Sequence, residues 1–162
     1  MLDEELGNSV ELISELNTTK DIQIDKYNLS RFHEAQEYSY QTALSEIKMG
    51  YKQSHWMWFI FPQIKGLGHS STAQYYSISC VNEARAYLED VVLGGRMREI
   101  CNELLNHSEK GVQRILGGID SIKLKSSMTL FDLISPNDVF HKILDVFYSG
   151  ERDKRTIEII KV

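Results

Sequence analysis

The chain has 162 residues, of which 42% are hydrophobic and 25% charged, so its length and composition are those of one globular domain. Two prolines and ten glycines are too few for a collagenous or low-complexity chain. The net charge is −5, yet residues 1–25 carry −6 and the remainder only +1, which argues against a strong nucleic-acid partner.

The sequence shows no pattern typical of secretion or membrane insertion. Its first residues are acidic and interrupted by charges, unlike a signal peptide. The longest apolar run, Trp56–Phe61, is far shorter than the roughly 20 residues of a membrane helix. Cys80 and Cys101 lack the spacing of metal ligands and are expected to be two reduced, buried thiols. We therefore expect a cytoplasmic protein that binds no membrane, no metal and no cofactor.

The charge distribution divides the chain into an acidic extension, residues 1–25, and a body, residues 26–162. Within the extension, apolar residues between Val10 and Leu16 have the spacing of one short amphipathic helix. Isolated helices of this length are marginal in water, so a docked helix and a frayed tail are both open.

Apolar residues recur with the 3.6-residue period of α-helices throughout most of the body. The period predicts helices over residues 28–50, 79–88, 93–105 and 120–133. Asn28 is expected to cap the first helix and Gly50 to end it, as one helix or as two with a break near Glu37. Ser79 is expected to cap the second helix, and Asp120 to open the fourth.

The last two helices have the clearest boundary signals. Ser135 is expected to cap a helix whose first turn holds Pro136, and Gly150 is expected to end it. Asp153 then caps a short final helix. Since no stretch alternates as a strand would, the sequence predicts an all-α, compact, multihelical single domain.

Four stretches of the body stand out in order: residues 31–32 with 35–36, residues 52–63 (KQSHWMWFIFPQ) with Gly66-Leu67-Gly68, residues 83–88 with 93–94, and residues 123–131 (KLKSSMTLF). Together they resemble the signature of the domain-of-unknown-function 1810 family, with departures at residues 37–38 and 91–92. The resemblance covers about residues 27–160. It implies a compact multihelical, stand-alone cytosolic domain and supplies no established activity. The calpastatin label sometimes attached to the family does not fit, because such inhibitors are disordered and repetitive whereas this chain has a core-forming pattern.

The tryptophan-rich stretch, residues 54–63, is the first candidate site. Its period does not distinguish helix from strand, and its tryptophans are expected either to fill the core or to stack on a planar ligand. His55 and Gln63 flank the apolar run and are expected either to be structural or to supply hydrogen bonds. The candidate ligand-binding residues here are Trp56 and Gln63.

The second candidate site is the hydroxyl-rich stretch from Lys123 to Thr129. On a helix, Lys125, Thr129 and Asp132 share one face, and a lysine beside several hydroxyls suits a phosphate or carboxylate. The alternative is that Ser126 and its neighbours permit close helix packing while the lysines stay solvated. Walker, Rossmann, zincin and nucleophile-elbow signatures are all missing from the sequence.

These observations leave two functions open, one as a ligand-binding domain and one as a protein-interaction module. In the first, a cleft lined by both stretches binds a small anionic, nucleotide-like molecule. If that molecule is hydrolysed without metal, Lys125 neutralises the anion and His55 or Asp132 is the general acid or base. In the second, the domain is a non-catalytic protein-interaction module whose acidic extension contacts a basic partner or folds back over its own domain.

Overall fold

The computed structural model describes residues 25–161 of the chain, which divides into two units, Met1–Arg31 and Phe32–Val162. In the first unit, the Asp25 carboxylate accepts the backbone N–H of Ser30 at 3.1 Å, where the first described helix begins. Asn28 has a left-handed φ of 54°. Asp25 therefore takes the capping role predicted for Asn28. The helix predicted between Val10 and Leu16 lies outside the described residues.

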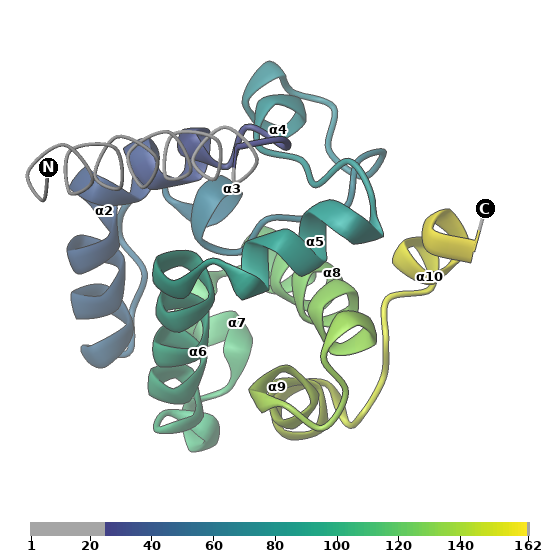
Figure 1. Ribbon diagram of the computed structural model, residues 1–162. Helices are drawn as coiled ribbons and strands as arrows, with labels where there is room; N and C mark the ends of the chain where they lie inside the picture. The colour runs from purple at the N-terminus through teal and green to yellow at the C-terminus, as the bar shows by residue number, and fades with distance from the viewer. Residues whose placement is uncertain (1–24, 162) are drawn as a thin grey trace, which may run out of the picture. The chain divides into compact units, whose positions relative to one another are not determined.

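The regular structure of residues 25–161 is helical, which confirms the all-α prediction. Extended backbone within this range pairs in one isolated parallel bridge between Ile64 and Ile78. The helices, labelled as in Figure 1, are α2 (Ser30–Lys48), α3 (Met57–Ile60), α4 (Ser71–Tyr75), α5 (Val81–Glu89), α6 (Val91–Leu105), the 3-10 turn η1 (Ser108–Lys110), α7 (Val112–Leu116), α8 (Gly118–Ile134), α9 (Val139–Tyr148) and α10 (Lys154–Lys161).

Helix α2 runs without interruption past Glu37, so the alternative of two helices is excluded. Phe32, Ala43 and Ile47 lie on its buried face. Beyond its end, Gly50 has a φ of 79° and donates its N–H to the Ile47 carbonyl. Gly50 therefore ends the helix as predicted, because only glycine adopts this conformation without strain.

Helix α8 is the central element of the core, in contact with α5, α7, α9 and α10 (Figure 1). Its Phe131 ring is fully buried, with the Tyr87 ring of α5 at 5.4 Å and the Phe140 ring of α9 at 5.8 Å between centroids. Aromatic contacts at these distances stabilise the core beyond the burial of their area. One side chain of α8 thus joins three helices.

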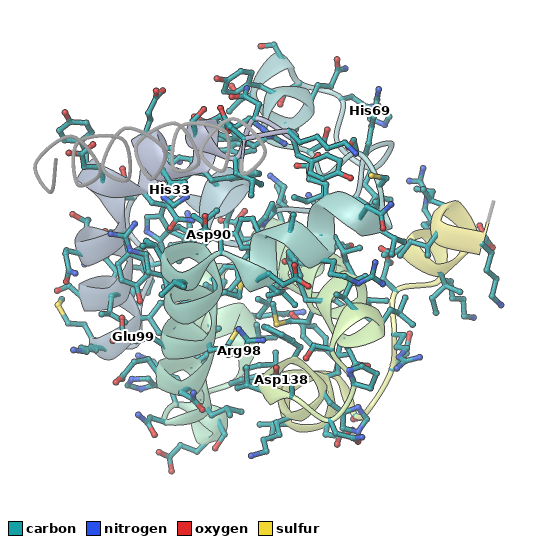
Figure 2. All side chains as sticks on the ribbon, viewed as in Figure 1. His33, His69, Asp90, Arg98, Glu99 and Asp138 are labelled. Carbon is teal, nitrogen blue, oxygen red and sulfur yellow. The ribbon has the colours of Figure 1, made fainter. Side chains whose placement is uncertain are left out.

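The junction between α5 and α6 depends on Asp90. Its carboxylate accepts the backbone N–H groups of Val92 and Leu93, both at 3.0 Å, which caps α6. The other carboxylate oxygen lies 2.8 Å from His33 Nε2 of α2, a pair labelled in Figure 2. Asp90 therefore fixes the start of α6 and connects it to α2.

Helix α9 begins three residues later than the sequence predicts. The capping residue is Asp138, whose carboxylate accepts the Val139 N–H at 2.7 Å, and Ser135 lies outside the helix and donates its hydroxyl to Asp138. The reason is tertiary: Arg98 of α6 donates to the same carboxylate at 3.1 Å (Figure 2). Asn137, with a φ of 64°, interrupts the expected first turn.

The C-terminal boundaries agree with their predictions. Gly150, with a φ of 77°, follows α9 and donates its N–H to the Leu144 carbonyl. The Asp153 carboxylate accepts the Thr156 N–H at 3.0 Å and caps α10. Among the described helices, none has the length and apolar character required to cross a bilayer.

The two adjacent glycines of α6 provide a matched test of the α5–α6 junction. A Cβ at Gly94 would lie 2.1 Å from the Leu88 carbonyl oxygen, whereas a Cβ at Gly95 would meet no atom within 4 Å. We expect Gly94→Ala to destabilise the protein by roughly 2 kcal/mol through overpacking. Gly95→Ala should be neutral or stabilising, because alanine favours helices. Thermal unfolding of both variants checks this, and equal melting temperatures would contradict the close approach.

Candidate functional site

A buried carboxylate organises the loop that carries the tryptophan-rich stretch. Glu46, near the end of α2, is buried. Its Oε1 accepts the backbone N–H groups of Gln53 at 2.7 Å and Ser54 at 2.9 Å, and the Trp56 indole N–H at 3.0 Å. Its Oε2 accepts the Ser54 hydroxyl at 2.6 Å. One side chain therefore satisfies four donors of a loop that has no helix or strand of its own between residues 51 and 56.

These hydrogen bonds keep Glu46 ionised. Burial alone would raise the pKa of this carboxyl, but the donors from Ser54, Gln53 and Trp56 outweigh burial and lower the pKa to about 2. A carboxylate that accepts several charge-assisted hydrogen bonds is stabilised in its ionised form. The loop is consequently held by a negative charge over a wide pH range.

Two further contacts position the residues on either side of this loop. The backbone N–H of Lys52 donates to the Ile115 carbonyl of α7 at 2.8 Å. The Gln36 amide of α2 donates to the Phe59 carbonyl of α3 at 2.8 Å and to the Tyr87 hydroxyl at 3.0 Å. The segment from Lys52 to Phe59 is thus held at both ends.

The segment and the first turns of α8 enclose a pocket of about 150 Å³, which we call the lysine–tryptophan pocket. It is lined by Lys52, His55, Trp56, Met57, Trp58, Asp120 and Lys123. His55 is exposed, Trp58 is half-buried, and Trp56 is fully buried. The pocket therefore combines an accessible imidazole, indole surface and three charged groups.

The charges of the pocket form a compact cluster. Asp120 lies 3.0 Å from the Lys52 ammonium and 3.9 Å from the Lys123 ammonium. The Lys52 side chain is 9% exposed, Asp120 20% and Lys123 29%. Two cations and one anion leave a net charge of one positive unit, partly removed from water, where charges interact more strongly.

Each lysine also stands over an indole. The Lys52 nitrogen lies 5.0 Å from the centre of the Trp56 ring, and the Lys123 nitrogen lies 5.6 Å from the centre of the Trp58 ring. These distances are those of cation–π contacts. The arrangement brings the tryptophan-rich stretch and the N-terminal part of α8 together at one opening.

A smaller cavity lies on the other side of Trp58. It has a volume of about 10 Å³, room for about one water, and it shares Met57, Trp58 and Lys123 with the lysine–tryptophan pocket. Gln63 lines this smaller cavity, and its carbonyl accepts the Ile78 N–H at 2.8 Å in the isolated bridge. Gln63 is therefore next to the lysine–tryptophan pocket without lining it.

The residues predicted on the second stretch have a different set of contacts. Lys125 donates to Glu151 at 2.8 Å, and this hydrogen bond lowers the pKa of the Glu151 carboxyl. The Thr129 hydroxyl accepts the Asp153 N–H at 2.9 Å. Asp132 accepts two hydrogen bonds from Arg152, the shorter at 2.6 Å. This face of α8 thus binds residues 151–153, which lead into α10.

Ser126 and Thr129 also have partners within α8. The Ser126 hydroxyl donates to the Ile122 carbonyl at 3.3 Å, and the Thr129 hydroxyl donates to the Lys125 carbonyl at 2.8 Å. Both side chains are buried. The residues of α8 that line the pocket with His55 are Asp120 and Lys123, in place of the predicted Lys125, Ser126, Thr129 and Asp132.

Sequence reasoning missed Lys52 and Asp120, and it selected the wrong lysine of α8 as a neighbour of His55. One available signal was that Asp120 and Lys123 are spaced i, i+3 and so share a helix face. Lys52 opens the stretch that resembles the family signature. No sequence signal indicated that Lys52 and Asp120 form an ion pair.

A second pocket, of about 220 Å³, is a weaker candidate. It is lined by Arg85, Leu88, Glu89, Arg98, Ile134 and Ser135. Arg98 is engaged by Asp138 through both Nε and Nη2, at 3.1 and 3.0 Å. The lining also contains one further charge of each sign, Glu89 and Arg85. Within residues 25–161, no three histidine, cysteine, aspartate or glutamate residues are grouped as metal ligands would be.

Removing the Glu46 charge tests the anchor of the site loop. We expect Glu46→Gln to lower the stability at pH 7 by about 2 kcal/mol, because an amide cannot accept all four hydrogen bonds. The folded-state pKa is depressed, so the stabilisation is present above the ordinary pKa of 4.5 and is lost as the pH falls toward about 2. Urea unfolding from pH 2 to 7 should show the two proteins converging in acid, and a constant difference would contradict the anchor.

Breaking the Asp132–Arg152 pair tests the structural role of the second stretch. Arg152→Ala leaves the buried Asp132 carboxylate without its guanidinium, so we expect a loss of about 2 kcal/mol. Adding Asp132→Asn should recover part of this loss. Arg155→Ala, at an exposed position of α10, is the control. Additive effects of the two substitutions in urea unfolding would contradict a coupled pair.

Comparison with known proteins identifies the family. The family model described as "Protein of unknown function (DUF1810)" matches residues 26–160. The crystal structure of the conserved hypothetical protein Rv1873 from Mycobacterium tuberculosis is similar with a TM-score of 0.83 and 40% identity, over 85% of this chain and 99% of that chain. No curated protein matches the chain. The chain therefore belongs to the DUF1810 family, as the four stretches predicted.

Proposed function

We propose that the lysine–tryptophan pocket binds a small anionic ligand that carries a planar, nucleotide-like ring. The observation that supports this is the coincidence of two lysines, each standing over an indole, with an exposed histidine at one opening. Indole faces stack on planar rings, and ammonium groups neutralise anions.

The size of the pocket limits how much of the ligand enters it. A cavity of about 150 Å³ holds a single six-membered ring. Trp58 is half-buried and forms an apolar wall, whereas the fully buried Trp56 belongs to the core. In this proposal one ring of the ligand lies against Trp58, and the remainder extends toward solvent.

The two lysines have different roles in the proposal. Lys52 is the more buried and the closer to Asp120, so it stays in its ion pair. Lys123 is more exposed and 3.9 Å from Asp120, and its flexible side chain reaches the ligand anion. Lys123 thus takes the neutralising role that the sequence assigned to Lys125.

His55 is the exposed imidazole of this pocket, and we assign it the role of general acid or base in any hydrolytic step. Asp132 is left out, because Arg152 engages it on another face of α8. Two free cysteines, one buried and one exposed, support a cytoplasmic location for this activity.

A protein-interaction role is the second candidate, and one observation favours it. Ile119 and Ile122 are 74% and 66% exposed on α8, next to the pocket residues Asp120 and Lys123. Exposed apolar residues at i, i+3 spacing are typical of a docking face. Substitution of these isoleucines would affect a protein partner and leave a small ligand in the pocket unaffected.

The sequence supplies a site-specific reporter for the first proposal. The chain contains two tryptophans, and both line the pocket, so intrinsic fluorescence reports on this site. Titration with a panel of nucleoside monophosphates and their cyclic forms should change the emission of the wild-type protein. Lys123→Ala should weaken binding at least about 10-fold, equivalent to about 1.4 kcal/mol.

Matched controls separate the site from general charge and stability effects. Lys142→Ala removes an exposed lysine of α9 and should leave the affinity unchanged. Trp58→Ala should abolish ligand-induced thermal stabilisation, whereas Tyr38→Ala, at an exposed aromatic residue of α2, should not. If Lys123→Ala and Trp58→Ala retain the wild-type response, or if no compound binds, the proposal is wrong.

A further inference from the structure

The fixed negative charge of Asp120 determines which anions the pocket accepts. Asp120 lies in the first turns of α8, where the helix dipole stabilises a carboxylate. Its 3.0 Å contact with Lys52 holds it in place, because Lys52 is 9% exposed and its backbone is bonded to Ile115. The Asp120 carboxylate therefore competes with a bound anion for the ammonium groups of Lys52 and Lys123.

From this charge cluster we infer that the group the pocket binds is a monoanion on a planar ring, such as a phosphodiester or a carboxylate. The inference rests on the proposed function and assigns Asp120 as its specificity-determining residue. Among the side chains that line the pocket, Lys52 and Lys123 supply two positive charges and Asp120 one negative charge, so one positive charge is left for the ligand. The Glu46 carboxylate is outside this lining, and its charge is satisfied by its own four donors. A monoanion neutralises the pocket.

A phosphomonoester is the disfavoured alternative. Its second ionisation has a pKa of about 6, so above neutral pH it carries nearly two negative charges. Bound beside Lys123, it would bring the second charge close to the Asp120 carboxylate, which is 3.9 Å from the Lys123 ammonium. The phosphate and the Asp120 carboxylate would then both be close to one ammonium, and two negative charges this close repel strongly where water is partly excluded. Asp120 thus lowers the affinity of the pocket for dianions through charge repulsion, without contacting the ligand ring.

Two probes that differ in one charge test the inference directly. Phenyl phosphate is a dianion at pH 8, and phenyl methyl phosphate has the same ring and phosphorus group with one negative charge. Both are titrated into the full chain at constant ionic strength, with binding followed by tryptophan fluorescence. We expect the wild-type protein to bind the monoanion at least about 5-fold more tightly than the dianion.

Substitution of the carboxylate should reverse this order. Asp120→Asn keeps the size of the side chain and raises the charge of the pocket by one unit, so the dianion should become the tighter ligand. Asp145→Asn, at an exposed carboxylate of α9, should keep the wild-type order. Circular dichroism and the melting temperature of each variant establish that it is folded before its titration is used.

The outcomes separate the inference from the proposed function. If the wild-type protein binds both probes through Lys123 but prefers the dianion or does not discriminate, the charge inference is overturned and the binding proposal stands. If the wild type prefers the monoanion and Asp120→Asn keeps that preference, the role of Asp120 is overturned. If neither probe nor any nucleotide binds, both proposals fail. The wild-type comparison decides the question even if Asp120→Asn does not fold.

Discussion

The structure of the site depends on one buried anion, the Glu46 carboxylate. The segment after α2 contains little regular structure, so its backbone donors need partners other than each other. Glu46 satisfies the donors of Gln53, Ser54 and Trp56 from a single position on a long helix. Because the loop is anchored there, Lys52 on one side and Trp58 on the other occupy defined positions. The carboxylate thus fixes the middle of a segment whose ends are held by Ile115 and Gln36.

The two faces of α8 explain why neighbouring lysines have different roles. Residues two positions apart on a helix point about 200° apart, so Lys123 and Lys125 cannot share a site. Lys123 faces the tryptophans, whereas Lys125 faces Glu151. In the structure, the anion beside Lys125 is a carboxylate of the chain itself. The hydroxyl of Thr129 and the carboxylate of Asp132 hold the same segment.

Short-range periodicity and some local caps were predictable from the sequence. The end of α2 at Gly50 and the cap at Asp153 depend on residues within a few positions, and both predictions are confirmed. The cap expected at Asn28 is supplied by Asp25 instead, and the sequence left open whether α2 is one helix or two. The start of α9 was predicted wrongly, because Arg98 of another helix selects Asp138 over Ser135. The site also depends on contacts between residues far apart in the sequence, which a local pattern cannot predict. The family motifs marked the tryptophan-rich stretch, but only tertiary structure pairs Lys52 with Asp120.

If the pocket binds a ligand as proposed, its size and its charge set the basis of its selectivity. A cavity for one ring buries too few atoms to distinguish large ligands by shape, since most of their surface would stay in water. Discrimination between ligands would then depend on specific contacts. These are stacking on the Trp58 indole and the charges of Lys52, Lys123 and Asp120. Lys52 and Asp120 are the least exposed charges of that cluster, so they are the least screened by salt. Under the proposed function, such a site would select a chemical class of ligand, a ring with a defined charge, rather than one molecule.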